Sequence, residues 1–162
     1  MIVDIARKYI GEREIPNNQG FVDMAFQTKM AAVGFQKGQA WCSYFAELVA
    51  KEAFPAKAAE FDKLFSASAV TTFSNFKSHG YQVSSTPVVG DLVIWQDQKD
   101  GKPTWTGHAG IVTQVLNSTT FKSVEGNTNN DGSREGYIVA EKTRSVKKVN
   151  NGLQVLGFIK LD

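Results

Sequence analysis

Three residues limit the chemistry that this chain can perform: a single cysteine, Cys42, and two histidines, His79 and His108. One thiol cannot form an intrachain disulfide. One cysteine and two histidines can build neither a cysteine-rich zinc site nor a three-histidine zinc site. Thiol chemistry in this chain must therefore use Cys42 as the nucleophile and one of the two imidazoles as its base.

Cys42 lies at the expected start of a helix that begins near Ala40 and ends at Pro55. The first turn of a helix has unpaired backbone N–H groups and a partial positive charge, and both stabilise a thiolate. A free cysteine is more often a small buried apolar residue. Position alone leaves both interpretations of Cys42 open.

The two histidines differ in their surroundings. His79 lies in Ser78-His79-Gly80 at an expected helix end, where an imidazole commonly interacts with the last carbonyl groups. His108 follows Gly107 at the expected start of a strand, where its ring is either solvated or available to the thiol. Of the two, His108 is the better candidate for the base.

An acidic residue and an amide residue are expected near His108. Strands at 108–115 and 119–125 should form a hairpin around residues 116–118. A two-residue turn pairs His108 with Asn127, and a slightly longer turn pairs it with Glu125. In either register the three side chains share one face, because strand side chains alternate with period two. Alternatively, Glu125 and Asn127 belong to an ordinary turn, since residues 126–130 are rich in turn formers.

Elsewhere the first half of the chain has helical patterns and the second half has strand patterns. Helices are expected at 2–10, 20–30, 40–54 and 68–79, with Gly11 and Gly80 as stops. Strands are expected at 91–95, 108–115, 119–125, 136–143 and 153–159, separated by turns at 101, 117–118, 129–132 and 150–152. Helices followed by an antiparallel meander predict an α+β domain.

The composition is that of an ordinary globular protein. The 162 residues are about the length of one domain, with 42% hydrophobic and 21% charged residues. A net charge of +2 is too small to indicate nucleic-acid binding. The modest basic cluster is interpreted as a solvated strand and turn, and it comprises Lys142, Arg144, Lys147 and Lys148.

No part of the sequence resembles a targeting or membrane segment. Residues 1–15 carry six charges and lack the apolar core of a signal peptide. The longest uncharged run, 103–121, contains many polar residues that a bilayer would not accept. We expect a protein made in the cytoplasm as a soluble chain, without stable membrane insertion.

The motifs together resemble a known family. The segments 40–43 (AWCS), 90–93 (GDLV), 107–112 (GHAGIV) and 125–129 (EGNTN) are similar to those of CHAP domains, the cysteine, histidine-dependent amidohydrolases/peptidases. The resemblance implies a papain-like, NlpC-type fold. In this fold the N-terminal helices pack on a C-terminal antiparallel sheet of about five or six strands. It also implies that residues 1–162 form a single catalytic domain without a separate wall-binding module.

The same resemblance implies roles for individual residues. Cys42 is the nucleophile, His108 is the general base and then the acid, Glu125 orients the imidazole, and Asn127 is a further polar member of the site. Many CHAP domains have Gln where this chain has Trp41, so the expected oxyanion donors are the Cys42 backbone N–H and the Gln39 side chain. Some relatives bind calcium through acidic residues ahead of the nucleophile, but segment 34–39 has none, so no calcium is expected. No other metal and no cofactor is expected either.

Peptidoglycan is the substrate implied by the resemblance. The bond is an amide, cut either by an N-acetylmuramoyl-L-alanine amidase or by an endopeptidase of the stem or crosslink, as in single-domain phage endolysins. Such a protein reaches the wall only after its release from the cytoplasm, and we expect it to be a monomer. Trp41, Trp95 and Trp105 are candidates for a substrate groove. Core packing is the expected role of Trp95, and substrate contact that of Trp105, in the loop before His108.

Three alternatives remain open at this point. A secreted antibacterial toxin would use the same chemistry. A papain-like protease or acyltransferase would keep the thiol site but act on a substrate outside the wall. A non-catalytic binding domain would keep only the fold.

Overall fold

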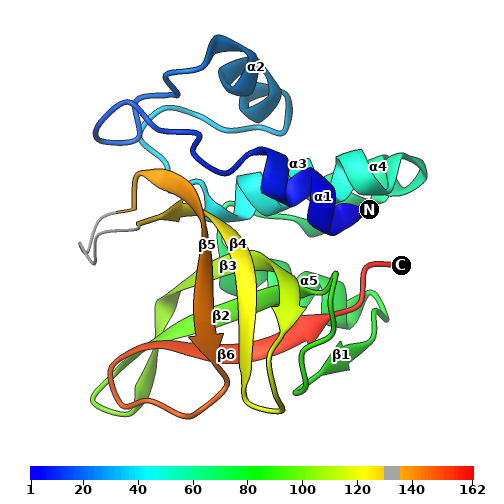
Figure 1. Ribbon diagram of the computed structural model, residues 1–162, viewed down its shortest axis with the longest axis vertical. Helices are drawn as coiled ribbons and strands as arrows, with labels where there is room; N and C mark the ends of the chain where they lie inside the picture. The colour runs from blue at the N-terminus through cyan, green and yellow to red at the C-terminus, as the bar shows by residue number, and fades with distance from the viewer. Residues whose placement is uncertain (130–135) are drawn as a thin grey trace.

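The computed structural model describes residues 1–129 and 136–162, in which helices precede strands (Figure 1). The helices are α1 (Ile2–Lys8), α2 (Met24–Ala32), α3 (Cys42–Ala53), α4 (Ala58–Leu64) and α5 (Ala69–Ser78), with a 3₁₀ turn at Pro55–Lys57. The strands are β1 (Val83–Ser84), β2 (Leu92–Lys99), β3 (Lys102–Val115), β4 (Thr120–Thr128), β5 (Ile138–Ser145) and β6 (Gly152–Ile159). The expected α+β class is confirmed.

Local side chains explain where several helices begin. The Asp23 carboxylate accepts the Phe26 N–H, which starts α2 at Met24 instead of Gly20. Ser68 caps α5 in the same way through the Thr71 N–H. Helix α4 is absent from the sequence prediction, which ended the helical segment at Pro55. Proline at the first position of a new turn favours helix initiation, and here it opens the 3₁₀ turn that leads into α4.

One antiparallel sheet contains the six described strands in the order β1-β6-β2-β3-β4-β5. The short strand β1 was not expected. Strand β3 begins at Lys102, six residues earlier than expected, so that His108 lies inside the strand and Trp105 lies in the strand instead of a loop. The turn expected at 129–132 lies outside the described residues apart from Asn129.

Near its open end, the hairpin of β3 and β4 has the register that was expected for a two-residue turn. Ile111 pairs with Val124 and Val112 pairs with Ser123. Continuing this register places Gly110 opposite Glu125. An irregularity between Val112 and Gln114 shifts the pairing by one residue toward the turn.

Apolar side chains pack on both faces of the sheet. The larger core lies between the helices and one face, and includes Phe45, Ile94 and Ile111. A smaller cluster on the other face is formed by Val93, Trp95, Val112, Phe121 and Phe158. Both faces are buried because neighbouring strand residues point to opposite sides. Each fully buried large apolar side chain contributes about 1.5–3 kcal/mol.

Helix α3 packs against β3 and β4, and two glycines permit the close approach of these elements. A Cβ atom on Gly126 would lie 2.6 Å from Phe45 Cβ and 2.8 Å from Trp41 Cζ3. A Cβ atom on Gly110 would lie 2.9 Å from Glu125 Cγ. Helix α3 therefore begins against the end of β4, close to the strand that carries His108.

Candidate active site

Cys42 is the first residue of α3 and is 6% exposed. The preceding residue, Trp41, occupies the N-cap position, but an indole has no acceptor that could cap the helix. Asn127 of β4 supplies an acceptor from across the fold: its Oδ1 accepts the Trp41 backbone N–H at 2.7 Å. The start of α3 is thus tied to β4 one residue before the thiol.

His108 and Glu125 form a buried pair. The Nε2 atom of His108 lies 2.8 Å from Glu125 Oε1, the imidazole side chain is 10% exposed, and the carboxylate is fully buried. Glu125 reaches the imidazole across Gly110, where the missing side chain leaves room for the Glu125 methylene groups. Glycine at 110 is therefore part of the geometry of this pair.

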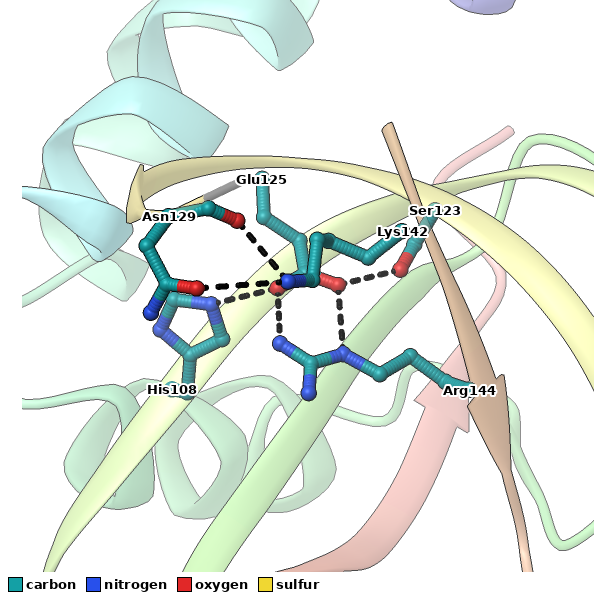
Figure 2. A network of polar contacts seen from close by, with 6 residues as sticks. All are labelled: His108, Ser123, Glu125, Asn129, Lys142 and Arg144. Carbon is teal, nitrogen blue, oxygen red and sulfur yellow. Dashed lines mark hydrogen bonds and ion pairs between the residues drawn. The ribbon is translucent and has the colours of Figure 1, made fainter. Parts of the chain in front are cut away.

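Four hydrogen bonds hold the Glu125 carboxylate (Figure 2). Oε1 interacts with His108 Nε2 and accepts from Arg144 Nη2. Oε2 accepts from Ser123 Oγ at 2.6 Å and from Arg144 Nε at 2.9 Å. Each oxygen thus has two donors, which compensates the cost of burying a carboxylate.

Arg144 was missed as a site residue by the sequence analysis, which placed it in a solvated cluster. The structure contradicts this interpretation: Arg144 pairs with buried Glu125, and its guanidinium carbon lies 5.3 Å from the centroid of the Trp95 ring. Trp95 is buried in the smaller core, as expected, and its ring lies 5.4 Å from that of His108. The sequence did hold one signal for Arg144: because side chains alternate along a strand, Lys142 and Arg144 lie on the same face of β5.

Ser123 was also missed. It lies two residues before Glu125 on β4, so the two side chains share one face of the sheet. Serine at this position is fully buried and donates to Glu125. The spacing of two residues on a strand was visible in the sequence, but its meaning depends on Glu125 being buried.

Electrostatics favour charge on both members of the pair. Burial alone lowers the pKa of His108, but hydrogen bonds and charges from Cys42 and Glu125 raise that pKa above its ordinary value. Burial raises the pKa of Glu125, but hydrogen bonds from Arg144 and His108 outweigh it and hold the pKa below its ordinary value. The site therefore stabilises an imidazolium between a carboxylate and the thiol of Cys42.

Asn127 forms its side-chain hydrogen bonds with backbone groups and not with the imidazole. It has φ +53° at an irregularity in β4, so the alternation that would have placed it beside Glu125 is interrupted. Its side chain accepts the Trp41 N–H and donates from Nδ2 to the Gly136 carbonyl at 2.9 Å. These bonds anchor the start of the helix that carries the thiol.

The residues expected to contact the substrate or its oxyanion differ in their surroundings, and they are Trp41, Trp105 and Gln39. Trp41 is fully buried, packs on Phe21 and donates from Nε1 to Glu14, so its side chain belongs to the core and not to a groove. Trp105 is 84% exposed on β3, three residues before His108. Gln39 accepts the Tyr44 hydroxyl at 2.9 Å through Oε1, which fixes the orientation of its side-chain amide.

His79 is remote from this cluster. It is the C-cap residue of α5, its side chain is 53% exposed, and Nε2 lies 3.9 Å from a Glu60 oxygen. His108, by contrast, interacts with Cys42.

Residues 1–129 and 136–162 contain neither a cluster of side chains suited to bind a metal ion nor a helix suited to span a membrane. These residues include no group of three or more His, Cys, Asp or Glu side chains arranged to hold a metal ion. No helix there has the length and apolar character needed to cross a bilayer.

The arrangement is suited to nucleophilic acyl transfer. Cys42 supplies a nucleophile at a helix N-terminus, where backbone N–H groups are available to stabilise negative charge. His108 can exchange a proton with the thiol, and Glu125 fixes the ring by binding Nε2. Because Nε2 is bound to Glu125, Nδ1 is the ring atom left for exchange with Cys42.

Comparison with models of protein families matches residues 34–127 to the CHAP domain. The matched region spans more than half of the chain and contains Cys42, His108, Glu125 and Asn127. A search among curated proteins finds no match.

Proposed function

Because the chain belongs to the CHAP family of cysteine/histidine-dependent amidohydrolases and peptidases, we propose that it hydrolyses an amide bond of bacterial peptidoglycan with Cys42 as the nucleophile. The observation that carries this proposal is the buried His108–Glu125 pair, whose imidazole interacts with the thiol at the start of α3.

The proposed reaction begins with transfer of the Cys42 proton to His108 Nδ1. The thiolate attacks the substrate carbonyl, and the Cys42 backbone N–H, with Gln39 as a second donor, stabilises the oxyanion. Loss of one oxyanion donor costs about 3–4 kcal/mol of transition-state stabilisation in comparable hydrolases. His108 then protonates the leaving amine, which departs as the thioester forms. Water, deprotonated by His108, releases the acid product and restores the thiol.

Trp105 is the proposed contact for the substrate. Its indole is the most exposed large apolar side chain among the described residues and lies on the strand that carries His108. An exposed indole offers a flat apolar face, which suits a sugar ring or an aliphatic segment of a stem peptide. Glu125 and Asn127 complete the site as the residues that hold the imidazole and the start of α3.

A cytoplasmic protein that is released onto the wall during lysis, as a phage endolysin is, fits this activity. Cells that make the protein should stay intact until a pore-forming protein is co-expressed, and should then lyse. Lysis without the pore former would contradict this route and favour a protein with its own export.

Product analysis tests the substrate and identifies the bond. Purified peptidoglycan is digested and the soluble products are measured by mass spectrometry, with Cys42→Ala as the inactive control. An amidase releases stem peptides from intact glycan strands, whereas an endopeptidase releases muropeptides cut within the stem or crosslink. Intact peptidoglycan, together with cleavage of an amide outside the wall, would contradict the proposal and favour a protease or acyltransferase.

A further inference from the structure

We propose that Arg144 is a positioning residue of this site. Its guanidinium orients the Glu125 carboxylate and keeps it ionised, and through Glu125 it holds His108 toward Cys42. The inference rests on the proposed function for its meaning in catalysis, but its geometry is independent of the substrate. Arg144 lies outside the matched residues 34–127, on β5.

The guanidinium binds the carboxylate of Glu125 with two hydrogen-bond donors. Arg144 donates from Nη2 to Glu125 Oε1 and from Nε to Oε2, in the parallel arrangement that matches a guanidinium to a carboxylate. Oε1 is also the atom that binds His108 Nε2. Rotation of the carboxylate would break both bonds to Arg144, so this pair sets the direction in which Glu125 presents Oε1 to the imidazole.

Trp95 fixes the guanidinium in turn. The Arg144 side chain is 24% exposed, and its guanidinium lies over the buried Trp95 ring. The same indole contacts the His108 ring. One aromatic side chain therefore supports both cations of the site. Lysine at position 144 would retain the charge, but it could not both donate two parallel hydrogen bonds to Glu125 and stack on Trp95.

Charge balance gives Arg144 a second effect. Glu125 is fully buried, and a buried carboxylate without a cation would take up a proton. His108 is a cation only until it passes its proton to the leaving amine. Arg144 stays charged throughout, so Glu125 remains a carboxylate when the imidazole is neutral and the imidazole can accept the next proton.

Two variants separate the charge of Arg144 from its geometry. Arg144→Met removes both, whereas Arg144→Lys keeps the charge. The matched control is Arg7→Met, because Arg7 forms a similar pair with Glu141 of β5, away from the site, at 2.9 Å. The first measurement is the rate at which iodoacetamide alkylates Cys42 as a function of pH. The second is the NMR titration of the His108 ring, assigned with the help of His79→Gln.

We expect Arg144→Met to move the His108 titration to lower pH by about one unit or more, because Glu125 without its guanidinium partner takes up a proton and no longer stabilises the imidazolium. With a less stable imidazolium beside the thiol, the low-pH limb of the alkylation rate should move to higher pH. Arg144→Lys should keep this limb near that of the wild type. On peptidoglycan its kcat should fall by roughly tenfold with little change in KM, because Arg144 contacts Glu125 and not the substrate. Arg7→Met should match the wild type in both measurements.

The proposal is wrong if Arg144→Met leaves both the alkylation profile and the His108 titration unchanged. It is also wrong if this variant lowers thermal stability and reduces the alkylation rate by the same factor at every pH, with the low-pH limb unmoved. That result would be a purely structural effect. If Arg144→Met does not fold, Arg144→Lys decides, because wild-type kcat in that variant would exclude a role for the guanidinium geometry. A shifted alkylation profile in a protein that leaves peptidoglycan intact would refute the proposed substrate and retain the role of Arg144.

Discussion

At His108 two opposing influences act on one imidazole. Its burial favours the neutral ring, whereas Cys42 and Glu125 favour the cation, and their sum raises the pKa of His108. The imidazolium is therefore retained to a higher pH than in an exposed histidine. A thiolate–imidazolium pair is lost when the ring deprotonates, so the basic limb of kcat/KM reports the support that Glu125 gives.

Replacing Glu125 by Gln tests that support. The amide keeps the size of the side chain but removes the charge beside His108, so the His108 pKa should fall. The basic limb of kcat/KM should move to lower pH, and kcat should drop by about 10²-fold. The control is Glu141→Gln, which makes the same change in the surface pair with Arg7. A basic limb that stays in place in Glu125→Gln would show that another group sets the charge of His108.

Asn127 is predicted to act on the helix and not on the imidazole. Asn127→Gly removes the acceptor of the Trp41 N–H while tolerating φ +53°, and should reduce the free energy of unfolding by about 1–3 kcal/mol. Asn127→Asp keeps an acceptor and should lose less stability. The His108 ring titration should stay as in the wild type in Asn127→Gly. A shift in that titration as large as the one in Glu125→Gln would assign Asn127 to the imidazole instead.

At the scale of elements, the site depends on the contact between the start of α3 and the end of β4. Gly126 lies in this contact, and its missing Cβ is what lets Phe45 and Trp41 pack against the strand. Glu125 and Asn127 flank this glycine, one facing the imidazole and the other the helix start. The Glu125-Gly126-Asn127 segment thus joins the two halves of the site.

Gly126→Ala should separate these elements. Because the added methyl group would lie within 2.8 Å of atoms in two bulky side chains, α3 must shift. We expect a loss of about 1–3 kcal/mol in denaturant unfolding and a drop in kcat. Gly152→Ala, in open space with φ +94°, should lose about 1 kcal/mol from backbone strain and keep full activity. Wild-type activity in Gly126→Ala would show that the contact does not position Cys42.

The sequence predicted most elements but not how far they extend. Periodicity and turn residues located α3, α5 and the hairpin of β3 and β4, whose register near the site is one of the two expected, that of a two-residue turn. The start of β3 was placed six residues late, because polar Thr104 and Thr106 lack the apolar signal of a strand although they lie within one. The irregularity at Asn127 was invisible, since Asn favours both a regular turn and the left-handed backbone found here.

At the scale of the whole molecule, the sheet separates two clusters of apolar residues, and buried carboxyl groups lie around them. Glu47 of α3 lies beside Lys51 and Asp62 and is 5% exposed. Burial, partly offset by Lys51 and reinforced by Asp62, raises the pKa of Glu47 to about 7. Burial also raises the pKa of Asp91 to about 6.

These carboxyl groups predict how stability depends on pH. A carboxyl whose pKa is raised on folding binds more protons in the folded state, so the free energy of unfolding falls as pH rises from about 4.5 to about 7. Glu47→Gln should flatten this slope and be more stable than the wild type at pH 8, by on the order of 1–2 kcal/mol. Asp4→Asn, at an exposed position of α1, is the control. An unchanged slope in Glu47→Gln, measured by denaturant unfolding across this range, would refute the role of Glu47.

Long-range partners are the part of the site that one sequence could not supply. Cys42, His108 and Glu125 were predicted because residue scarcity and the alternation of strand side chains narrow the choices, and the CHAP resemblance implied their roles. Arg144 looked like one member of a surface cluster, because its partner, Glu125, is found only through the pairing of β4 with β5. The burial of Trp41 likewise depends on α2 and the 15–23 segment folding over it.

The release of new amino groups from purified peptidoglycan by wild-type protein and by Cys42→Ala tests the central claim most directly. Both proteins should have the same circular dichroism spectrum and the same melting behaviour within about 1 kcal/mol, because the substitution removes only a small side chain at a helix start. The account predicts steady release by the wild type and a loss of roughly 10⁴-fold or more in Cys42→Ala. Release by folded Cys42→Ala at a rate near that of the wild type would contradict it.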